Sequence, residues 1–342
     1  MPHKTFVAFI WPSLFAMILF IAIPIFSVGY QSLFIGHEQI LIMSESCGPF
    51  GCQPEVSVDA EAMRQLREEQ PMGRYNGLGT YTNSSHLAFS DINEIFRSSS
   101  NFGEIRDKIM NLPFYKALIF TLAYTFIVTP LVIILGFTVA VVVNSIPKNF
   151  KGPVIFFSLL PMIVTPLVGA LVLYWMIDSR GIIGAGLQAL FGDPNLSLKA
   201  SPTLTWVTLF VNGVWHSSPF AVVVYYAGVQ TEPSDTLESA MVDGANRWER
   251  IRFVIMPYLL PLATFIALMQ LMDNFRVFEP IIGFSAAASA TSLSYLIYND
   301  LRAAESPLFG SAAATSLLTI LGVVILLLPV LRRNWREFNR KS

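Results

Sequence analysis

Long apolar segments alternate with polar connections along this chain. A helix needs roughly 20 mostly apolar residues to cross a hydrocarbon layer about 30 Å thick, and six segments reach that length. They lie at Phe6–Phe34, Phe114–Ser145, Pro153–Ile177, Leu204–Val229, Tyr258–Ile282 and Gly310–Leu331. The pattern predicts an all-α, polytopic membrane protein with six transmembrane helices.

The composition supports the same class. Hydrophobic residues make up 54% of the chain and charged residues 13%, with a mean hydropathy of +0.56, far from the values of soluble domains. The formal net charge of −1 excludes a strongly basic nucleic-acid binder, so we expect the lipid bilayer and no nucleic acid as a partner. Two cysteines and four scattered histidines predict neither a disulfide framework nor a metal site.

Residues 35–113 form the one extended polar region, with eleven acidic side chains against six basic ones. We expect a short solvated helix at 60–70 and a loop at 98–101, in a region too small and too polar for an independent enzyme domain. The chain then divides into 1–34 with the first span, the polar loop 35–113, a transmembrane core at 114–331 that contains the loop 230–257, and a tail at 332–342.

The basic residues in the short connections predict the orientation. With both termini inside, eleven Lys and Arg residues lie inside and three lie in the two short outside loops, as the positive-inside rule favours. Both termini and the loop 230–257 are therefore expected in the cytoplasm, and the loop 35–113 outside. The first segment runs nearly thirty residues without a clear small-x-small cleavage site, so we interpret it as an uncleaved span.

The loop 230–257 carries signals for ordered structure. Asp235 followed by Glu238 predicts a capping box at the start of a short helix. Gly244 lies where that helix would end, because glycine best adopts the left-handed conformation at a helix terminus. A second helix is expected at 247–254, before Pro257 starts or kinks the fifth span. An amphipathic loop lying on lipid headgroups is the alternative interpretation.

The same loop resembles the signature of ABC-importer permeases, E-A-A, three residues, G, nine residues, I-x-L-P. Ser239, Val254 and Met256 depart from that signature by small substitutions. Further similarity lies at Pro12 and Pro24, 114–118 with Thr121, Leu160-Pro161 with Trp175, Trp215 with Pro219-Phe220, and 273–279. The neighbourhood of Asp243 and Trp248 is similar to the binding-protein-dependent sugar permeases of maltose type. Ser285–Ser289 departs from the Gly-Gly-Pro of many relatives.

The resemblance implies a type I importer permease fold, in which the loop is a coupling helix that docks on an ATPase subunit. The residues it assigns to ATPase coupling are Glu238, Ser239, Ala240, Asp243, Gly244, Ala245 and Pro257. It also implies a second permease subunit, two ATPase subunits and a periplasmic solute-binding protein. No Gly-Lys dipeptide of a phosphate-binding loop occurs, so we expect no cofactor on this chain and ATP with Mg on the ATPase chains.

The fifth span carries charged residues, which are costly in a membrane. Asp273, Arg276 and Glu279 are three apart, on roughly one helix face, and Asp273 lies roughly 24 Å beyond Pro257. One interpretation is a mutually paired stripe near the outer interface. The other is a polar face that binds sugar hydroxyls in a central cavity. The candidate substrate-pathway residues, supported by the resemblance to maltose-type permeases, are Gln270, Asp273, Asn274 and Arg276.

The two cysteines, one histidine and the cargo are the remaining expectations from the sequence. Cys47 and Cys52 flank a glycine- and proline-rich turn, and in an oxidising periplasm we expect a disulfide between them to close a small loop, with two free thiols as the alternative. His216 is expected to be a packing residue, and we expect no catalytic residue. The expected cargo is a carbohydrate or polyol. An importer of another solute such as glycerol phosphate, a secondary transporter and a membrane enzyme are the alternatives.

Overall fold

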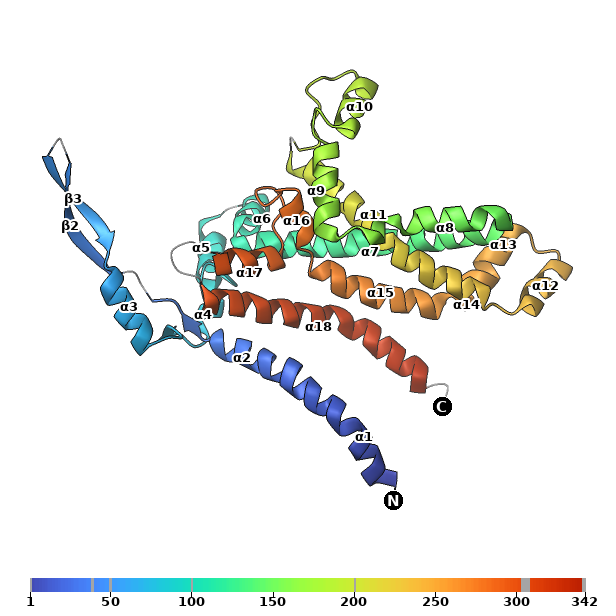
Figure 1. Ribbon diagram of the computed structural model, residues 1–342, viewed down its shortest axis with the longest axis horizontal. Coiled ribbons are helices and arrows are strands. Elements are labelled where there is room, and N and C mark those ends of the chain that lie inside the picture. The colour runs from blue at the N-terminus through green and yellow to red at the C-terminus, as the bar shows by residue number, and fades with distance from the viewer. Residues whose placement is uncertain are drawn as a thin grey trace. The chain divides into compact units, whose positions relative to one another are not determined.

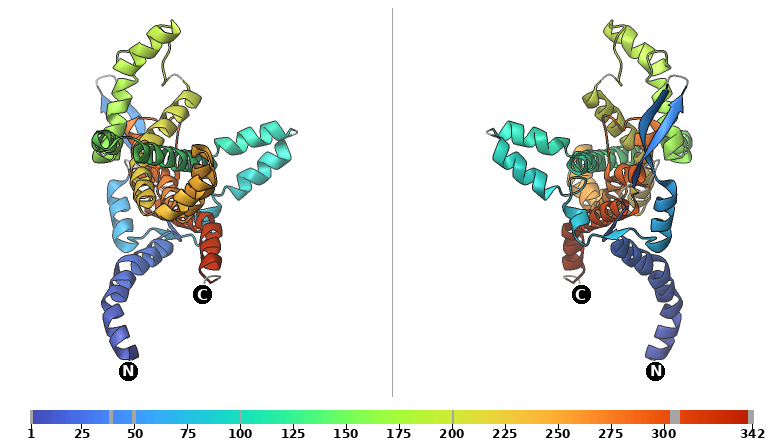
Figure 2. Two further views of the ribbon diagram at one scale, coloured as in Figure 1. Left: turned by 90° about the vertical axis from the view of Figure 1, so that its right-hand side faces the viewer. Right: turned by 90° about the vertical axis from the view of Figure 1, so that its left-hand side faces the viewer.

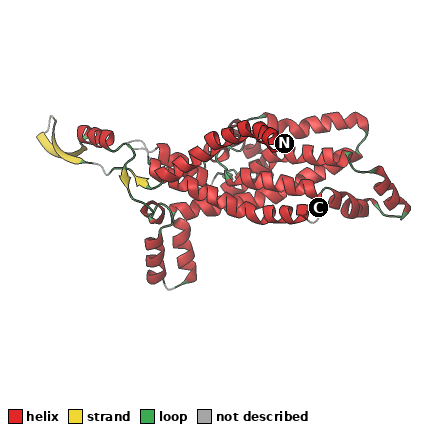
Figure 3. Cartoon of the chain, turned by 90° about the horizontal axis from the view of Figure 1, so that it is seen from below, coloured by secondary structure: helices red, strands yellow, loops and turns green. Residues whose placement is uncertain are grey.

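The computed structural model describes residues 2–37, 40–48, 51–99, 101–199, 201–302 and 308–339. The chain divides into two compact units. The first contains Met1–Tyr115 and Leu296–Leu321, and the second contains Lys116–Tyr295 and Gly322–Ser342. Helices dominate both units, and the described strands are confined to the polar segment after the first span (Figure 3).

The first span is helical from α1 (Pro2–Met17) through a π-helical turn (Ile18–Ala22) to α2 (Ile23–Gln31). It ends three residues earlier than expected, because the chain turns at Ser32 and enters β1 (Phe34–Ile35). β1 pairs antiparallel with β4 (Arg74–Tyr75). The Ser32 hydroxyl donates to the Gly29 carbonyl over 2.6 Å and also contacts the Tyr81 hydroxyl.

The polar segment 35–113 folds into a hairpin and short helices. β2 (Leu41–Gly48) and β3 (Gly51–Val58) form the antiparallel hairpin, and the expected solvated helix is α3 (Ala60–Glu69), which Asp59 caps through the amides of Glu61 and Ala62. The remaining helices of this segment are α4 (Gly79–Thr82), α5 (Phe89–Ser98) and α6 (Phe102–Asn111). Figure 2 shows α5 and α6 lying side by side.

The hairpin register brings the backbones of Cys47 and Cys52 opposite each other. Directly opposed strand residues have Cα atoms about 4.5–5.5 Å apart, within the range that a disulfide spans. The side chains of residues 44–55 lie outside the described residues. The bridge between the two cysteines therefore remains a prediction.

A buried histidine connects the polar segment to the last helices within the first unit. His86 has no solvent-exposed surface, and its ring nitrogens lie 2.9 Å from Asn83 Oδ1, 3.1 Å from the Ser311 carbonyl and 3.1 Å from Thr315 Oγ1. The Ser311 hydroxyl donates to Asp300 over 2.7 Å. Burial lowers the pKa of His86 and raises the pKa of Asp300. These contacts join residues of 79–88 to α17 (Leu293–Arg302) and α18 (Phe309–Asn339).

The second unit is a bundle of long helices. Figure 1 shows its main members α7 (Pro113–Ser145), α8 (Lys148–Ile163), α11 (Pro202–Gln230) and α15 (Leu260–Phe275) running alongside one another. α11 packs against both α8 and α15. Gly136 of α7 allows close approach to α11, because a Cβ at that position would overlap the Ala221 methyl group.

Two of the six apolar segments are bent pairs of helices rather than single rods. α8 and α9 (Pro166–Met176) meet at 98°, and the pair Arg247–Tyr258 and Leu260–Phe275 meets at 64°. Pro166 explains the first bend, because a proline disfavours helix at the preceding residue and Thr165 is extended. Four described helices are long and apolar enough to cross a membrane singly, and six spans result if each bent pair counts as one.

The fifth apolar segment is interrupted a second time near its end. α15 stops at Phe275, and α16 (Glu279–Gly283) begins after three residues outside the helix. The expectation that Asp273, Arg276 and Glu279 share one helix face is therefore wrong. After α16, the segment Ser285–Ser289, which replaces the Gly-Gly-Pro of many relatives, forms a turn with Ser285 at φ 51°. Trp206 Nε1 donates to the Ser289 carbonyl over 2.9 Å and holds that turn on α11.

Candidate functional site

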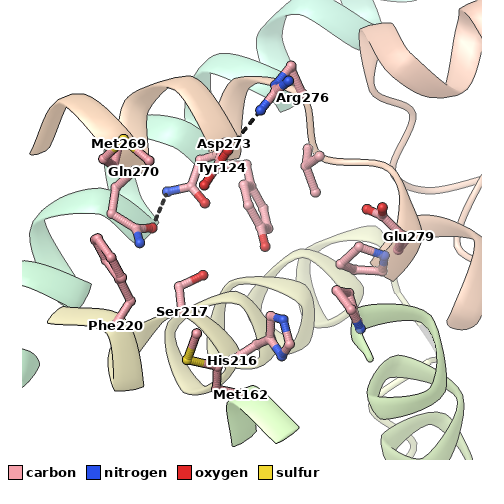
Figure 4. Close-up of a pocket in the computed structure, with 14 residues that line it drawn as sticks. Tyr124, Met162, His216, Ser217, Phe220, Met269, Gln270, Asp273, Arg276 and Glu279 are labelled. Atoms are coloured by element: carbon pink, nitrogen blue, oxygen red, sulfur yellow. Dashed lines mark hydrogen bonds and ion pairs between the residues drawn. The ribbon is translucent and has the colours of Figure 1, made fainter. Parts of the chain in front are cut away.

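A cavity with a volume of about 600 Å³ lies in the second unit. Its lining residues come from six helices and the α15–α16 connection, and Figure 4 shows them converging on one space. They are Tyr124, Met162, Pro166, His216, Ser217, Phe220, Met269, Gln270, Asp273, Asn274, Arg276, Val277, Glu279 and Pro280. Sites for small ligands have volumes of about 300–1,000 Å³, so the cavity has room for one.

All four predicted substrate-pathway residues line this cavity. Gln270 and Asn274 are almost fully buried, at 4% and 5% exposure. Asn274 Nδ2 donates to Thr129 Oγ1 of α7 over 3.0 Å and lies 3.5 Å from Gln270 Oε1. The pair of amides therefore connects α15 to α7 and presents polar atoms at the cavity wall, where sugar hydroxyls could exchange hydrogen bonds with them.

Asp273 and Arg276 form an ion pair of 2.8 Å that also lines the cavity. Both side chains are about half exposed, at 55% and 57%, so the pair is open to whatever fills the cavity. The pair thus has the ion pairing of the first interpretation and the position at a cavity of the second, and sugar binding by it stays a prediction. The wider stripe is not formed, since Glu279 lies on α16 and makes no ion pair among the described side chains.

Several cavity residues were missed from the sequence. Tyr124 of α7 faces the cavity, and Gly213 of α11 makes room for it, because a Cβ there would overlap the Tyr124 hydroxyl. His216, which was expected to be a packing residue, also lines the cavity. The available signal was the α11 spacing, since His216, Ser217 and Phe220 fall within little more than one helical turn.

The second candidate site is the loop 230–257. α12 (Ser234–Val242) is the expected short helix, but its N-cap is Pro233 and no side chain caps it, so the predicted capping box at Asp235 and Glu238 is wrong. Asp235 lies within the first turn of the helix, and the Ser239 hydroxyl donates to the Asp235 carbonyl over 2.8 Å. Ser239 therefore fits the helix by bonding to its own backbone.

The turn after α12 has the conformation predicted for Gly244. Its φ is +80°, and its amide donates to the Met241 carbonyl over 3.1 Å. The Ala245 amide donates to the Ala240 carbonyl over 2.9 Å, which completes a Schellman motif. Asp243 is the C-cap residue of α12. Gly244 is thus required by the backbone rather than by packing, since no atom lies within 4 Å of a Cβ built there.

A capping box starts the next helix instead. Asn246 Oδ1 accepts from the Glu249 amide over 2.9 Å, and Glu249 Oε2 accepts from the Asn246 amide over 2.8 Å. α13 (Arg247–Arg250) continues through a π-helical turn (Ile251–Ile255) into α14 (Met256–Tyr258), so Pro257 lies just before the 64° bend. The expected second helix is confirmed, but its second half, Ile251–Ile255, is π-helical rather than α-helical.

The base of the loop is tied to the bundle. Tyr258 donates to the Thr231 carbonyl over 2.8 Å, and Gln230 Nε2 donates to Asn144 Oδ1 of α7 over 2.8 Å. Between these ties, α12 and α13 lie at one end of the second unit in Figure 1. Burial raises the pKa of Glu232, whose carboxylate oxygens have no hydrogen-bond partner among the described residues.

The loop also exposes large apolar side chains. Val242 is 87% exposed, and Trp248 and Phe253 are each 67% exposed. A folded helix–turn–helix that is anchored at its base and apolar on its surface has the features of a docking element. The second unit thus has a cavity lined in part by polar side chains and a structured loop at one end of the bundle.

Comparison with known proteins identifies the class. Residues 110–332 match the family described as "binding-protein-dependent transport system inner membrane component". This chain belongs to that family, and it is therefore a multi-pass inner-membrane permease component.

Individual relatives refine the comparison. The chain is 25% identical to the trehalose/maltose transport system permease protein MalF of Thermococcus litoralis over 62% of this chain and 71% of that protein. It is 27% identical to the multiple sugar-binding transport system permease protein MsmF of Streptococcus mutans over 63% of this chain and 74% of that protein.

A solved structure shares the fold. It is a bacterial ABC transporter involved in the import of the acidic polysaccharide alginate, with a TM-score of 0.61 and 18% identity over 80% of this chain and 95% of that chain.

Proposed function

We propose that this chain is a permease subunit of an ATP-driven ABC importer that moves a carbohydrate or polyol across the inner membrane. The observation that carries the proposal is the cavity, where Gln270, Asn274 and Tyr124 offer amide and hydroxyl groups beside apolar surface. That combination suits a ligand with many hydroxyl groups. The sugar-related names of the relatives support the cargo class.

The proposed partners are a second permease, two ATPase chains and a periplasmic solute-binding protein. ATP and Mg would bind to the ATPase chains, and the loop 230–257 would dock on one of them through its exposed apolar side chains. The residues assigned to coupling lie on α12, in the turn after it and before the 64° bend, and they are Glu238, Ser239, Ala240, Asp243, Gly244, Ala245 and Pro257. Movement of the docked loop would then shift α11 and α15, which the loop joins directly.

The orientation belongs to the same proposal. The distribution of basic residues favours cytoplasmic termini, which places the loop 230–257 on the ATPase side and the segment 35–113 in the periplasm. An importer of a non-sugar solute such as glycerol phosphate is the alternative, and a secondary transporter is a more distant one.

Replacement of Gln270 by alanine tests the proposed pathway in the assembled transporter. We expect lower ATP-driven uptake, with unchanged basal ATPase activity and unchanged affinity of the solute-binding protein for its ligand. Gln188→Ala is the matched control, because Gln188 lies on α10 (Ile182–Phe191), outside the cavity lining, and donates to the Leu196 carbonyl. Normal uptake in Gln270→Ala, with the complex intact, would contradict the assignment of the cavity.

A further inference from the structure

The charges around the cavity do not cancel. Three of the fourteen lining residues are formally charged at pH 7 with histidine counted as neutral, namely Asp273, Arg276 and Glu279. Asp273 and Arg276 neutralise each other through their 2.8 Å ion pair. The carboxylate of Glu279 is left over, so this chain contributes a net charge of −1 to the cavity wall.

Glu279 is placed to act on a ligand. It is an exposed residue at the start of α16, and Figure 4 shows its carboxylate at the edge of the space between Tyr124 and His216. It lies close enough to both of those side chains to interact with them electrostatically. Among the described residues, no lysine or arginine lies within ion-pair distance of it.

Two lysines of the second unit, Lys199 and Lys116, are already engaged. Lys199 forms an ion pair of 3.0 Å with Asp178 and lies over the ring of Tyr174, at 3.3 Å from its centroid. The hydrogen bond from Lys199 holds the pKa of Asp178 below its usual value. Lys116 donates to the Ala288 carbonyl over 3.3 Å. Neither lysine lines the cavity, so neither offsets Glu279 there.

An unpaired charge at a cavity wall discriminates between ligands by sign. At a separation of about 6 Å and an effective dielectric constant of about 40, one unit charge changes the occupancy of a singly charged ligand by roughly tenfold. A neutral sugar is unaffected, a cation is favoured and an anion is disfavoured. Salt reduces the effect less inside a cavity than on an open surface.

We infer that Glu279 makes this side of the pathway electronegative, so that it passes neutral or amine-bearing sugars in preference to carboxylated or phosphorylated ones. This inference rests on the proposed function, and it narrows the range of cargo that the proposed importer would carry. A phosphorylated polyol such as glycerol phosphate would meet repulsion from Glu279 without a free cation of this chain in the cavity. Glu279 is therefore a specificity-determining residue that excludes anionic cargo.

Thiol probes of opposite charge test the inference without knowledge of the cargo. Ser217 lines the cavity, and Ser217→Cys adds a nearly isosteric thiol in a chain whose Cys47 and Cys52 are replaced by serine. The assembled transporter in detergent is treated with a cationic methanethiosulfonate, the ethyltrimethylammonium reagent, and with the anionic ethylsulfonate reagent. The rate of reaction with the cationic reagent is divided by the rate with the anionic reagent. This ratio is then normalised by the same ratio for free 2-mercaptoethanol, which removes the intrinsic difference between the two reagents. Any charge that the second permease contributes is included in this measurement.

We expect the normalised cation-to-anion ratio to exceed one by at least about tenfold, and Glu279→Gln to reduce it by at least about tenfold. Asp193→Asn is the matched control, because Asp193 is an exposed carboxylate outside the cavity, and it should leave the ratio unchanged. Met269→Cys repeats the measurement from α15 if Ser217→Cys does not assemble. A ratio near one, or a ratio that Glu279→Gln does not change, overturns the inference.

A protection experiment separates this result from the proposed function. Glucosamine, glucose and glucuronate are added in turn while the thiol of the Ser217→Cys variant reacts with uncharged methyl methanethiosulfonate. We expect glucosamine and glucose to slow the reaction more than glucuronate, and Glu279→Gln to remove the difference. Glucuronate protection equal to that of glucose overturns the inference. Failure of all three sugars to protect counts against a carbohydrate pathway, while the reagent ratio still decides the charge of the cavity.

Discussion

Gly244 provides the sharpest test of the loop as a coupling element. Its φ of +80° lies in the left-handed region, and a Cβ built on it meets no atom within 4 Å. Gly244→Ala therefore adds backbone strain without a steric clash. The left-handed conformation costs an L-residue about 1–2 kcal/mol. The substitution thus changes the angle between α12 and α13 and should leave the bundle intact.

That cost sets the size of the expected effect. A change of about 1–2 kcal/mol alters a two-state population by roughly 5- to 30-fold, so the docking-competent turn should become rarer by about that factor if it is in equilibrium with another conformation. Asparagine tolerates the left-handed region better than alanine does. Gly244→Asn should therefore lose less activity than Gly244→Ala.

ATP-driven uptake and co-purification of the ATPase measure the effect together. Gly152→Ala is the control, because Gly152 lies in α8, has no atom within 4 Å of a built Cβ and lacks a positive φ. It should retain uptake. Wild-type uptake and ATPase association in Gly244→Ala would refute the reasoning, as would a greater loss in Gly244→Asn than in Gly244→Ala.

Three further predictions concern charge, pH and the hairpin. The double variant Asp273→Arg with Arg276→Asp exchanges the charges of the ion pair. It should assemble but remain defective in uptake, because the pair also faces the cavity. Full uptake in this double variant would mean that the pair is purely structural. Burial lowers the pKa of His86, so the folded state binds fewer protons than the unfolded state as pH falls through the usual value of 6.5, and stability is lost in that range. Hydrogen exchange at 79–98 should thus be faster at pH 5.5 than at pH 7.5 after correction for intrinsic rates, with a smaller difference in His86→Gln. Mass spectrometry of alkylated, unreduced protein should show neither Cys47 nor Cys52 labelled, and labelling of both would exclude the bridge.

The apolar pattern was sufficient to predict where the membrane helices lie. An apolar segment of about 20 residues is long enough to cross the lipid as a helix, so the number and length of such segments predict the all-α class. The bend between α8 and α9 was harder to predict, because Pro166 sits inside an apolar run where prolines such as Pro130 and Pro219 also occur within continuous helices. Hydrophobicity alone does not distinguish these cases.

The loop shows a similar limit at shorter range. Gly244 was predicted correctly, because only a few residue types suit a left-handed helix terminus. The capping box was assigned to Asp235 and Glu238, although Asn246 and Glu249 form it. Both pairs have the same spacing of three residues. In the structure α12 begins at Ser234, directly after its N-cap residue Pro233, so Asp235 lies inside the helix and not at the N-cap.

Tertiary contacts determine the rest of the cavity. Gln270 and Asn274 could be predicted because polar residues are rare within an apolar span. Tyr124 could not, since an aromatic residue in α7 gives no sign of facing a cavity until Gly213 of the neighbouring helix is seen to make room for it. Glu279 was recognised as a charge that needed explanation, but its separation from the Asp273 pair depends on the break after Phe275.

ATP-driven accumulation in sealed proteoliposomes tests the central claim most directly. The vesicles contain this chain with its second permease and ATPase subunits, and the solute-binding protein carries a labelled sugar on the opposite side from ATP. We expect accumulation only when ATP and the binding protein are both present, and a loss of accumulation in Gln270→Ala. Accumulation that an ion gradient drives without ATP, or uptake that does not depend on the binding protein, would contradict the account.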